Sequence, residues 1–320
     1  MIDETDDIKV SVCVVTYNQE KYIAECLDSL VSQETDFKFE IIVGEDCSTD
    51  GTRAIVQQYV DKYPDIVKPV FHEQNVGAVE NIKQVYLAAK GKYIAHMDGD
   101  DMACDEKLQA QFDVLENRAS CNVCSHDVMS IDSCGNTRRN YLVSPEGEYS
   151  LIDFYKNLSL FCHSSKMFRN KYSEQYWQNV LDQTDKLDID LHIANLQDGN
   201  VYHIGKTLGK YRVSVGVSYI DTKVNSVLPL GNIRIYNDAL ETFKDNEEDL
   251  LLIKKAYALS MLQWAYNYAV HDKDNKLFRE YVNRSISQYD IGLKQRIFKV
   301  GTYSTSLFFF VLKIRKRVRR

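Results

Sequence analysis

The sequence contains no apolar run long enough to cross a bilayer. Residues 306–312 form a stretch of seven mainly apolar positions, whereas a transmembrane helix needs about 20. Residues 1–7 are acidic and lack both the basic region and the apolar core of a signal peptide. We therefore expect a soluble protein that stays in the cytoplasm.

A second Cys-x-x-Cys pair is also missing. Cys121 and Cys124 form one such pair, and His126 and Cys134 follow nearby. Two thiolates at this spacing can share a zinc ion, but a structural zinc site needs four ligands. The alternation of residues 121–129 fits a strand. Small buried thiols are thus the favoured interpretation, and the eight cysteines are expected to stay reduced.

The composition is that of a globular protein with a full core. The 320 residues are 44% hydrophobic, which suggests one large domain and a smaller one. The formal net charge of −7 argues against a general nucleic-acid binder, so we expect no nucleic-acid partner. The charge is uneven, because six of the last eight residues are basic.

Strand and helix patterns alternate through the first half of the chain. The predicted strands are residues 10–15, 39–43, 67–71 and 93–97, and the predicted helices are residues 21–31, 52–62 and 78–89. This alternation favours an α/β fold with a mostly parallel sheet covered by helices on both faces. Such sheets bind ligands at the carboxyl ends of their strands.

Three carboxylates within four residues follow the fourth predicted strand. They are Asp98, Asp100 and Asp101. Such carboxylates repel one another unless a cation or a polar ligand compensates them. Oxygen ligands suit Mg²⁺ or Mn²⁺, which often bind together with phosphates, so a nucleotide diphosphate is the expected partner. The alternative is an acidic turn in which Asp101 or Asp105 caps the next helix.

These segments, in this order and spacing, closely resemble family 2 of the nucleotide-sugar glycosyltransferases. The likeness rests on residues 14–18, 43–52, 75–77, 97–101, 188–193 with Gly199, and 211–213, within a match from about 8 to 220. The resemblance implies an inverting, metal-dependent glycosyltransferase of the GT-A fold, a Rossmann-like sheet flanked by helices. It also implies a place in the synthesis of a bacterial surface polysaccharide such as O-antigen or capsule.

The resemblance and a change to helical patterns from about Leu228 onward divide the chain into three parts. The expected parts are a GT-A catalytic domain at residues 1–225 (nucleotide-sugar binding about 8–130, acceptor side about 131–225), a helical C-terminal region at 226–305 and an aromatic and basic tail at 306–320.

On the donor side, the resemblance places Thr16, Tyr17 and Asn18 at the base and ribose of the nucleotide and Asp46 at the base. A carboxylate can accept from the imide N–H of uracil or thymine but not from N3 of cytosine, so a UDP-sugar, or else a thymidine one, is the expected donor. Glu45 stands where the family usually carries a first Asp. The alternatives are an Asx turn or a helix cap for Asp46 and a sheet-edge aromatic for Tyr17.

In the acidic motif, the resemblance assigns Asp98 to the ribose or nucleotide side and Asp100 to the metal ion. Asp101 is assigned to the donor sugar or to the orientation of its neighbours. Mn²⁺ or Mg²⁺ would stabilise the charge that grows on the β-phosphate as the glycosidic bond breaks. Many family members carry a His after the Tyr-Arg pair, but this chain has Ser214 there. The expected metal ligands are therefore Asp100, the diphosphate and water.

The acceptor hydroxyl needs a base that removes its proton during a single displacement with inversion. Residues 182–190 offer four carboxylates, and the apolar spacing beyond them predicts a helix that starts at Asp188. The resemblance gives the base role to Asp188, although Leu187 replaces the usual Gly or Glu, and Asp190 is the rival. The alternative for Asp188 is a helix cap worth about 1 kcal/mol.

Two further residues fall on the acceptor side of the resemblance. His163 stands where related chains line the acceptor pocket, and a satisfied structural histidine is the equal alternative. Arg212 either approaches the phosphates or pairs with surface acids. The sequence leaves both choices open.

The tail at residues 306–320 joins aromatic residues to a Lys and Arg cluster. This combination suits the surface of an anionic cytoplasmic leaflet, where each basic residue contributes about 1 kcal/mol. The alternative is a packed helix with a solvated basic end. With the tail at the membrane, the acceptor would be a glycan or oligosaccharide on a polyprenyl diphosphate carrier, and the protein would be peripheral on the cytoplasmic face.

Two other functions are weighed against this one. A sugar-phosphate nucleotidyltransferase would need a Gly-rich, basic loop near the first strand to hold a triphosphate, and residues 16–20 are neither. A nonenzymatic nucleotide-sugar-binding protein would keep the pocket. The acidic motif and the candidate base count against it.

Overall fold

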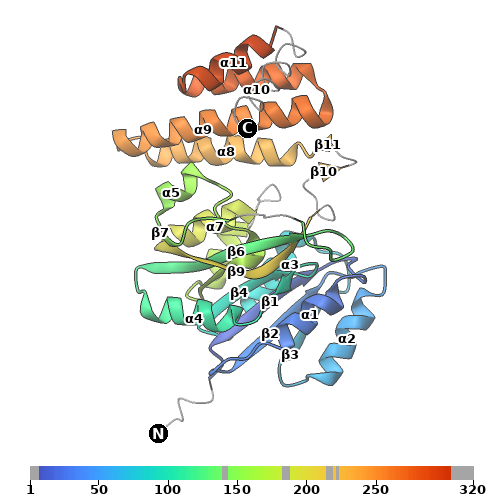
Figure 1. Cartoon of the computed structure of the whole chain (residues 1–320). Coiled ribbons are helices and arrows are strands. Elements are labelled where there is room, and N and C mark those ends of the chain that lie inside the picture. Colours follow the sequence, from blue (N-terminus) through green and yellow to red (C-terminus); the bar gives the residue numbers. More distant parts are fainter. Residues whose placement is uncertain (1–6, 139–142, 182–187, 214–218, 221–222, 304–320) are drawn as a thin grey trace. The chain divides into compact units, whose positions relative to one another are not determined.

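The computed structural model describes residues 7–138, 143–181, 188–213, 219–220 and 223–303. The chain divides into two compact units, drawn in sequence colours in Figure 1. The first unit combines Met1–Phe154 with Leu158–Val215, and the second combines Tyr155–Asn157 with Gly216–Arg320.

One half of the first unit's sheet is parallel. Its strands stand in the order β3 (Val67–Phe71), β2 (Phe39–Glu45), β1 (Val10–Thr16) and β4 (Tyr93–Asp98). They alternate with the helices α1 (Ile23–Val31), α2 (Thr52–Lys62) and α3 (Ala78–Ala88). Each of these predicted elements is confirmed, with bounds that shift by at most two residues.

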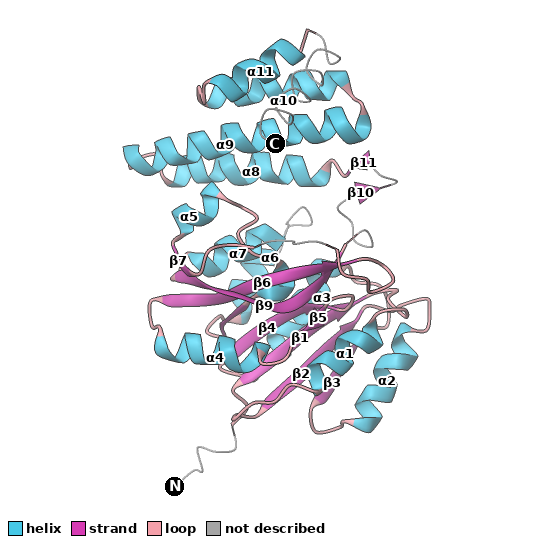
Figure 2. Ribbon diagram, in the orientation of Figure 1, coloured by secondary structure: helices cyan, strands magenta, loops and turns pink. Residues whose placement is uncertain are grey.

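The path of the chain decides which face each helix covers. The chain steps one way across the sheet from β1 to β3 and then returns to β4 on the other side of β1. Because such crossovers are right-handed, α1 and α2 cover one face and α3 covers the opposite face, as Figure 2 shows. Ile23, Leu27 and Leu30 of α1 are fully buried in the apolar core, as their spacing predicts.

The other half of the sheet is mixed. The short strand β8 (Met167–Arg169) lies antiparallel to both β4 and β6 (Cys121–Ile131), and β9 (Asn200–Arg212) runs parallel to β6. The strands β5 (Met102–Ala103) and β7 (Gly147–Tyr149) pair antiparallel with β9. The predicted mostly parallel sheet therefore holds for β1 to β4 and for the long pair of β6 and β9, and the antiparallel pairs all involve one of the short strands β5, β7 and β8. Strands of two or three residues carry no readable alternation, so their direction could not be predicted.

The remaining helical segments of the chain up to residue 215 are α4 (Lys107–Asn117), α5 (Leu151–Lys156), the 3₁₀ turn η1 (His163–Ser165), α6 (Glu174–Leu181) and α7 (Asp188–Leu196). The turn η1 lies against β4. The helix α7 is described from Asp188, and the residues before it, 182–187, lie outside the described part of the chain.

From Gly216 onward, the second unit's described residues are helical, apart from a small hairpin of β10 (Tyr219–Ile220) and β11 (Lys223–Val224). Its helices are α8 (Val227–Thr242), α9 (Glu247–Asn267), which continues into a π-helical turn at Tyr268–Asp272, α10 (Asn275–Gln288) and α11 (Leu293–Gly301). Tyr236 of α8 stacks on Tyr257 of α9 with ring centroids 5.0 Å apart. Among the described residues, no helix has the length and apolar character needed to cross a membrane.

Candidate functional site

The loops after β1, β2 and β4 meet at the carboxyl edge of the parallel strands. The Asp46 N–H donates to the Thr16 carbonyl at 3.1 Å, and the Gly99 N–H donates to the Val15 carbonyl at 2.9 Å. A Cβ on Gly99 would lie only 2.9 Å from the Thr16 Cβ, so glycine is needed for this approach. The three polar segments that the sequence placed at strand ends are thus brought together.

The β1 loop presents one aromatic residue to solvent. Thr16 is buried, whereas Tyr17 keeps 45% of its surface exposed. Asn18 adopts a left-handed backbone with φ of 52°, which Asn tolerates better than most residues. The Asn18 Oδ1 accepts from the Thr49 N–H at 2.8 Å, and the Asn18 N–H donates to the Ser48 Oγ at 3.0 Å. These bonds fix the loop and leave Tyr17 available for a ligand.

The two acidic residues after β2 both have internal partners. Glu45 is fully buried, pairs with Arg53 and accepts from the Ser48 N–H at 2.6 Å. Asp46 is 2% exposed, and its two oxygens accept from the backbone N–H groups of Val76 and Gly77 at 2.7 and 2.9 Å. Asp46 therefore clamps the loop after β3, a contact that neither an Asx turn nor a helix cap describes. Each oxygen keeps a second lone pair.

Asp98, at the end of β4, is held by two side chains. Its Oδ1 lies 3.2 Å from the His96 Nε2, and its Oδ2 accepts from the Ser164 Oγ at 3.1 Å. The Asp98 N–H also donates to the Ser164 Oγ at 3.0 Å. Burial works against the charged form of Asp98, but the hydrogen bonds outweigh it, and its pKa lies below the usual value. Asp98 is thus a fixed anion.

The other two carboxylates of the acidic motif behave differently. Burial raises the pKa of Asp100 to about 6, and the charge of Asp98 adds to the rise. Asp101 is 1% exposed, and burial, followed by the charges of Asp98 and Asp100, raises its pKa well above the usual value. Three anions are therefore unfavourable here without a cation, as the sequence pattern suggested.

Asp101 is turned into the protein. Its Oδ1 accepts from the Arg212 N–H at 2.8 Å, and its Oδ2 has no hydrogen-bond partner among the described residues. Of the two roles weighed for Asp101, its contacts favour orientation of its neighbours.

Arg212 is engaged by protein groups. Its guanidinium donates to the Asp100 carbonyl at 2.9 Å, to the Asp132 carbonyl at 2.9 Å and to the Glu25 carboxylate at 2.6 Å. It also lies over the Tyr22 ring at 4.4 Å. These contacts favour the interpretation in which Arg212 pairs with an acid over the one in which it approaches phosphates. Its effect on the site is to fix the backbone of Asp100.

His163 belongs to a group of three buried histidines beside Asp98. The His163 Nδ1 lies 3.1 Å from the His192 Nε2, and the rings of His163 and His96 have centroids 3.7 Å apart. Burial lowers the pKa of all three, so they are neutral at pH 7. Sequence reasoning missed His96 and Ser164. His96 could have been found, since residues i and i+2 of a strand share a face and Asp98 follows it by two.

Asp188 begins α7, and its Oδ1 accepts from the Ile189 N–H at 2.9 Å. Solvent reaches its side chain, but the protein around it disfavours the charge and raises its pKa, and the charge of Asp98 adds to this. Lys166 has the opposite influence. Asp190 is half-buried in the first turn. The other two carboxylates of this segment, together with Leu187, Ser214 and the tail at 306–320, lie outside the described residues.

Few potential metal ligands lie close together among the described residues. No group of three or more His, Cys, Asp or Glu side chains gathers in a metal-binding arrangement within the described part of the chain. All eight cysteines are free, and Cys121 and Cys124 are buried in β6, as expected for structural thiols. The hard oxygens of the acidic motif suit Mg²⁺ or Mn²⁺.

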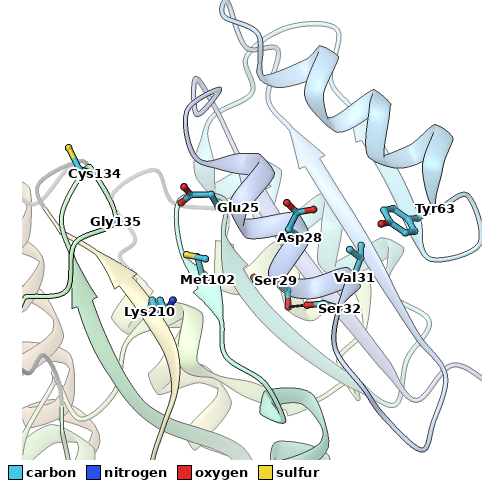
Figure 3. Close-up of a pocket in the computed structure, with 10 residues that line it drawn as sticks. All are labelled: Glu25, Asp28, Ser29, Val31, Ser32, Tyr63, Met102, Cys134, Gly135 and Lys210. Atoms are coloured by element: carbon cyan, nitrogen blue, oxygen red, sulfur yellow. Dashed lines mark hydrogen bonds between the residues drawn. The ribbon is translucent and has the colours of Figure 1, made fainter.

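A separate hollow of about 790 Å³ lies on the surface of the first unit. Figure 3 shows Glu25 and Asp28 of α1 on one side of it and Cys134 and Lys210 on the other. None of the residues predicted for the donor or the base lines this hollow.

Comparisons with known proteins agree with this geometry. The putative teichuronic acid biosynthesis glycosyltransferase TuaG of Bacillus subtilis is 28% identical over 206 residues, which cover 64% of this chain and 79% of TuaG. An uncharacterised protein of Mycobacterium tuberculosis is 30% identical over 209 residues, or 63% of this chain, which spans 58% of that relative's length.

The fold is that of a solved glycosyltransferase. The crystal structure of Staphylococcus aureus TarS 1–349 in complex with UDP-GlcNAc matches with a TM-score of 0.55 and 20% identity, covering 92% of this chain and 79% of that one. This confirms the predicted α/β, GT-A architecture. The sequence profile of glycosyl transferase family 2 matches residues 11–177, more than half of the chain. The predicted family is therefore confirmed, and the chain belongs to glycosyl transferase family 2.

Proposed function

We propose that this chain transfers one sugar from a UDP-sugar to a hydroxyl of a glycan acceptor, with inversion and with a divalent cation. The observation that carries the proposal is the convergence of three polar loops on the acidic motif, at the edge of the parallel strands. This is where open α/β sheets bind their ligands. TarS, which shares the fold, binds UDP-GlcNAc and UDP.

Donor recognition is assigned to the loops after β1 and β2. Tyr17 is the exposed aromatic there, and it offers a face on which a uracil ring can stack. Thr16 and Asn18 shape the backbone beside it. Asp46 supplies the carboxylate for the imide N–H through the lone pairs that its two backbone bonds leave unused. Asp98 faces the ribose as an anion that His96 and Ser164 hold in place.

Asp100 is the residue that would hold Mn²⁺ or Mg²⁺, and Asp101, through its bond to the Arg212 N–H, is assigned to the orientation of its neighbours. A cation bound there stabilises negative charge on the departing diphosphate as a Lewis acid. The elevated pKa of Asp100 supports this assignment, because a carboxylate among other anions gains most from a nearby cation.

Asp188 is assigned as the base on the acceptor side. Its Oδ1 accepts from the Ile189 N–H, so Oδ2 is the oxygen to which we assign the acceptor proton. Solvent reaches Asp188 more freely than the half-buried rival Asp190. One carboxylate on this side suffices for a single displacement.

The acceptor is proposed to be carried on a polyprenyl diphosphate at the cytoplasmic membrane face, in the synthesis of a bacterial surface polysaccharide. Leu293 and Val300, two turns apart on α11, are 72% and 48% exposed. Residues 291–320 contain nine Lys and Arg and no Asp or Glu. Exposed apolar side chains among cations suit an anionic lipid surface. The name of TuaG, in teichuronic acid biosynthesis, supports the polysaccharide context.

The proposal is tested first by the thermal shift of the full chain with UDP, with and without Mn²⁺. At a hundred times its dissociation constant, a ligand stabilises the fold by about 2.7 kcal/mol. We expect a Mn²⁺-dependent shift that Asp100→Ala removes and that Asp113→Ala, at an exposed site on α4, retains. The same shift in both variants would contradict the role of Asp100. A shift without transfer to any glycan acceptor would favour a nonenzymatic sugar-nucleotide binder.

A further inference from the structure

The hollow in Figure 3 is bounded by elements that hydrogen bonds hold together. The Ser29 Oγ of α1 accepts from the Ala103 N–H of β5 at 3.0 Å, and β5 pairs antiparallel with β9. Met102 and Lys210 are direct partners in that pairing, so their side chains stand on one face. The volume of about 790 Å³ lies within the roughly 300 to 1,000 Å³ of small-ligand sites. The hollow is therefore a preformed site of ligand size.

Three charged side chains of the hollow have bonding capacity to spare. Glu25 and Asp28 stand one turn apart on α1. The Glu25 Oε2 accepts from Arg212 at 2.6 Å, and the Asp28 Oδ1 accepts from the Tyr59 hydroxyl at 2.7 Å. The Glu25 Oε1, the Asp28 Oδ2 and the Lys210 Nζ have no hydrogen-bond partner among the described residues. The walls thus offer two acceptors and a donor to a ligand.

The charges of these side chains select the chemical class of the ligand. Two carboxylates against one ammonium repel a phosphate, a diphosphate or a uronic acid. A purely apolar ligand would take three charged groups out of water without giving them a partner. A chain of neutral sugars matches them, because each sugar hydroxyl can donate to a carboxylate and accept from an ammonium. Val31 and Tyr63, which also line the hollow, add apolar surface for the C–H faces of the sugar rings.

Glu25 connects the hollow to the acidic motif. The Arg212 guanidinium donates to the Glu25 carboxylate at 2.6 Å and to the Asp100 carbonyl at 2.9 Å. Met102, which lines the hollow, directly follows Asp101 in the chain. A single side chain thus joins a wall of the hollow to the segment that the proposed function uses.

We propose that this hollow binds a neutral, hydroxyl-rich segment of the glycan acceptor, the part that lies beyond the sugar that reacts. The inference rests on the proposed function, because it presumes that the acceptor is a glycan. Glu25 and Asp28 accept from the sugar hydroxyls, and Lys210 donates to them. None of the three is assigned to the donor or to the base, so the hollow adds affinity for longer acceptors and takes no part in the displacement.

Binding is tested first without turnover, by NMR of the full chain with isotope-labelled methionine methyl groups. The probes are chitotetraose and maltotetraose, two neutral tetrasaccharides, and tetragalacturonate, an anionic one of equal length. The Met102 methyl reports on the hollow, and the Met261 methyl, buried in α9, is the control. We expect a saturable shift of Met102 with a neutral probe and none with tetragalacturonate, while Met261 stays unchanged.

Variants from two walls of the hollow sharpen this test. Lys210→Met and Asp28→Ala should each weaken binding of the neutral probe by about tenfold, as the loss of a hydrogen bond to a charged group does. Lys206→Met, on the same strand β9 but not among the residues that line the hollow, is the matched control and should bind as wild type does. No Met102 shift with either neutral probe would overturn the proposal. An equal shift with tetragalacturonate would overturn it too, because the charge argument excludes an anionic glycan.

A kinetic measurement separates this inference from the proposed reaction. In an active enzyme, Lys210→Met should raise KM for a tetrasaccharide acceptor by about tenfold relative to KM for its terminal monosaccharide, and Lys206→Met should not. A saturable Met102 shift in a protein that transfers no sugar would sustain the hollow as a glycan site while the proposed function failed. An active enzyme with no Met102 shift and the same KM ratio in both variants would refute the inference and leave the function standing.

Discussion

The acidic motif and the cationic stretch at residues 291–320 handle charge in opposite ways. In the acidic motif, Asp98 is held by His96 and Ser164, and Asp101 is held by the Arg212 backbone. In α11, the side chains of the cationic residues Lys294, Arg296 and Lys299 are exposed. The acidic motif fixes its charges in one geometry, and the described cations of α11 lie on its exposed surface.

This difference indicates two kinds of partner. Fixed, partly buried carboxylates act at short range and select a small ligand by the position of its charges. Cations on exposed, flexible side chains are screened within about 10 Å and gain little from any single pair, but together they attract an extended anionic surface. In the proposed function, the first region takes a cation and a diphosphate, and the second region faces anionic lipid.

The largest expected effect concerns the fixed carboxylates. Asp188→Asn keeps the shape of the side chain but removes the base, and we expect transfer to fall by about 10²- to 10⁴-fold while UDP affinity stays unchanged. Steady-state kinetics and UDP titration measure both. Asp190→Asn is the matched control and should reduce transfer far less. The reverse ranking of the two variants would assign the base to Asp190.

The second effect concerns the cationic surface. Removal of residues 306–320, which carry six Lys and Arg, should weaken binding to vesicles with anionic lipid by at least tenfold, since each basic residue contributes about 1 kcal/mol. Leu293→Glu with Val300→Glu should weaken it by a similar factor, measured by co-sedimentation at 0.15 M salt. Leu259→Glu, at a site on α9 that is 42% exposed, is the control. Equal vesicle binding by all these variants would rule out the membrane role.

The smallest expected effect concerns the stability of the metal-free protein and how it depends on pH. The pKa of Asp100 is raised to about 6, so the folded protein takes up protons more readily than the unfolded chain, and its stability falls as pH rises from about 4 to 6. Asp100→Asn should therefore raise the melting temperature of the metal-free protein by about 2 to 4 °C at pH 7, as about 1 kcal/mol would, and leave it unchanged at pH 4.

For Asp50→Ala we expect the melting temperature to fall, the opposite of the rise expected for Asp100→Asn. Asp50 accepts from the Thr52 N–H at 3.0 Å at the start of α2, and hydrogen bonds outweigh burial to lower its pKa. Its loss removes the hydrogen bonds from the Thr52 N–H and Oγ1 and should lower the melting temperature at pH 7, by the effect of about 1 kcal/mol of lost stability. Differential scanning calorimetry at both pH values compares the two variants. A fall for Asp100→Asn at pH 7 would show that Asp100 serves the fold.

Much of the parallel half could be predicted because its signals are local. Ile23, Leu27 and Leu30 repeat with the helical period, and the β-branched run of β1 ends where Thr16 and Tyr17 begin the loop. The order of Asp46, Asp98 and Asp188 along the chain carries the family likeness. That Asp46 and Asp98 meet at one sheet edge follows from parallel strands ending on the same side.

The mixed half could not be predicted in the same way. Ser125, His203 and Asp127 illustrate the reason: the Ser125 Oγ lies 2.9 Å from the His203 Nδ1, and the His203 Nε2 lies 2.8 Å from the Asp127 Oδ1. In sequence these types suggest a nucleophile with its base, yet Ser125 is 0% exposed and cannot reach a substrate. Only burial shows that they form a structural network.

The sequence by itself determined the family, the parallel strands and the carboxylates that gather at their ends, because periodicity and short motifs are written in neighbouring residues. The tertiary structure decided which of those carboxylates are held by hydrogen bonds from other protein groups and which have a raised pKa. It also brought three buried histidines, from β4, η1 and α7, together beside Asp98. These properties depend on burial and on partners far apart along the chain, and neither burial nor distance is a local feature of a sequence.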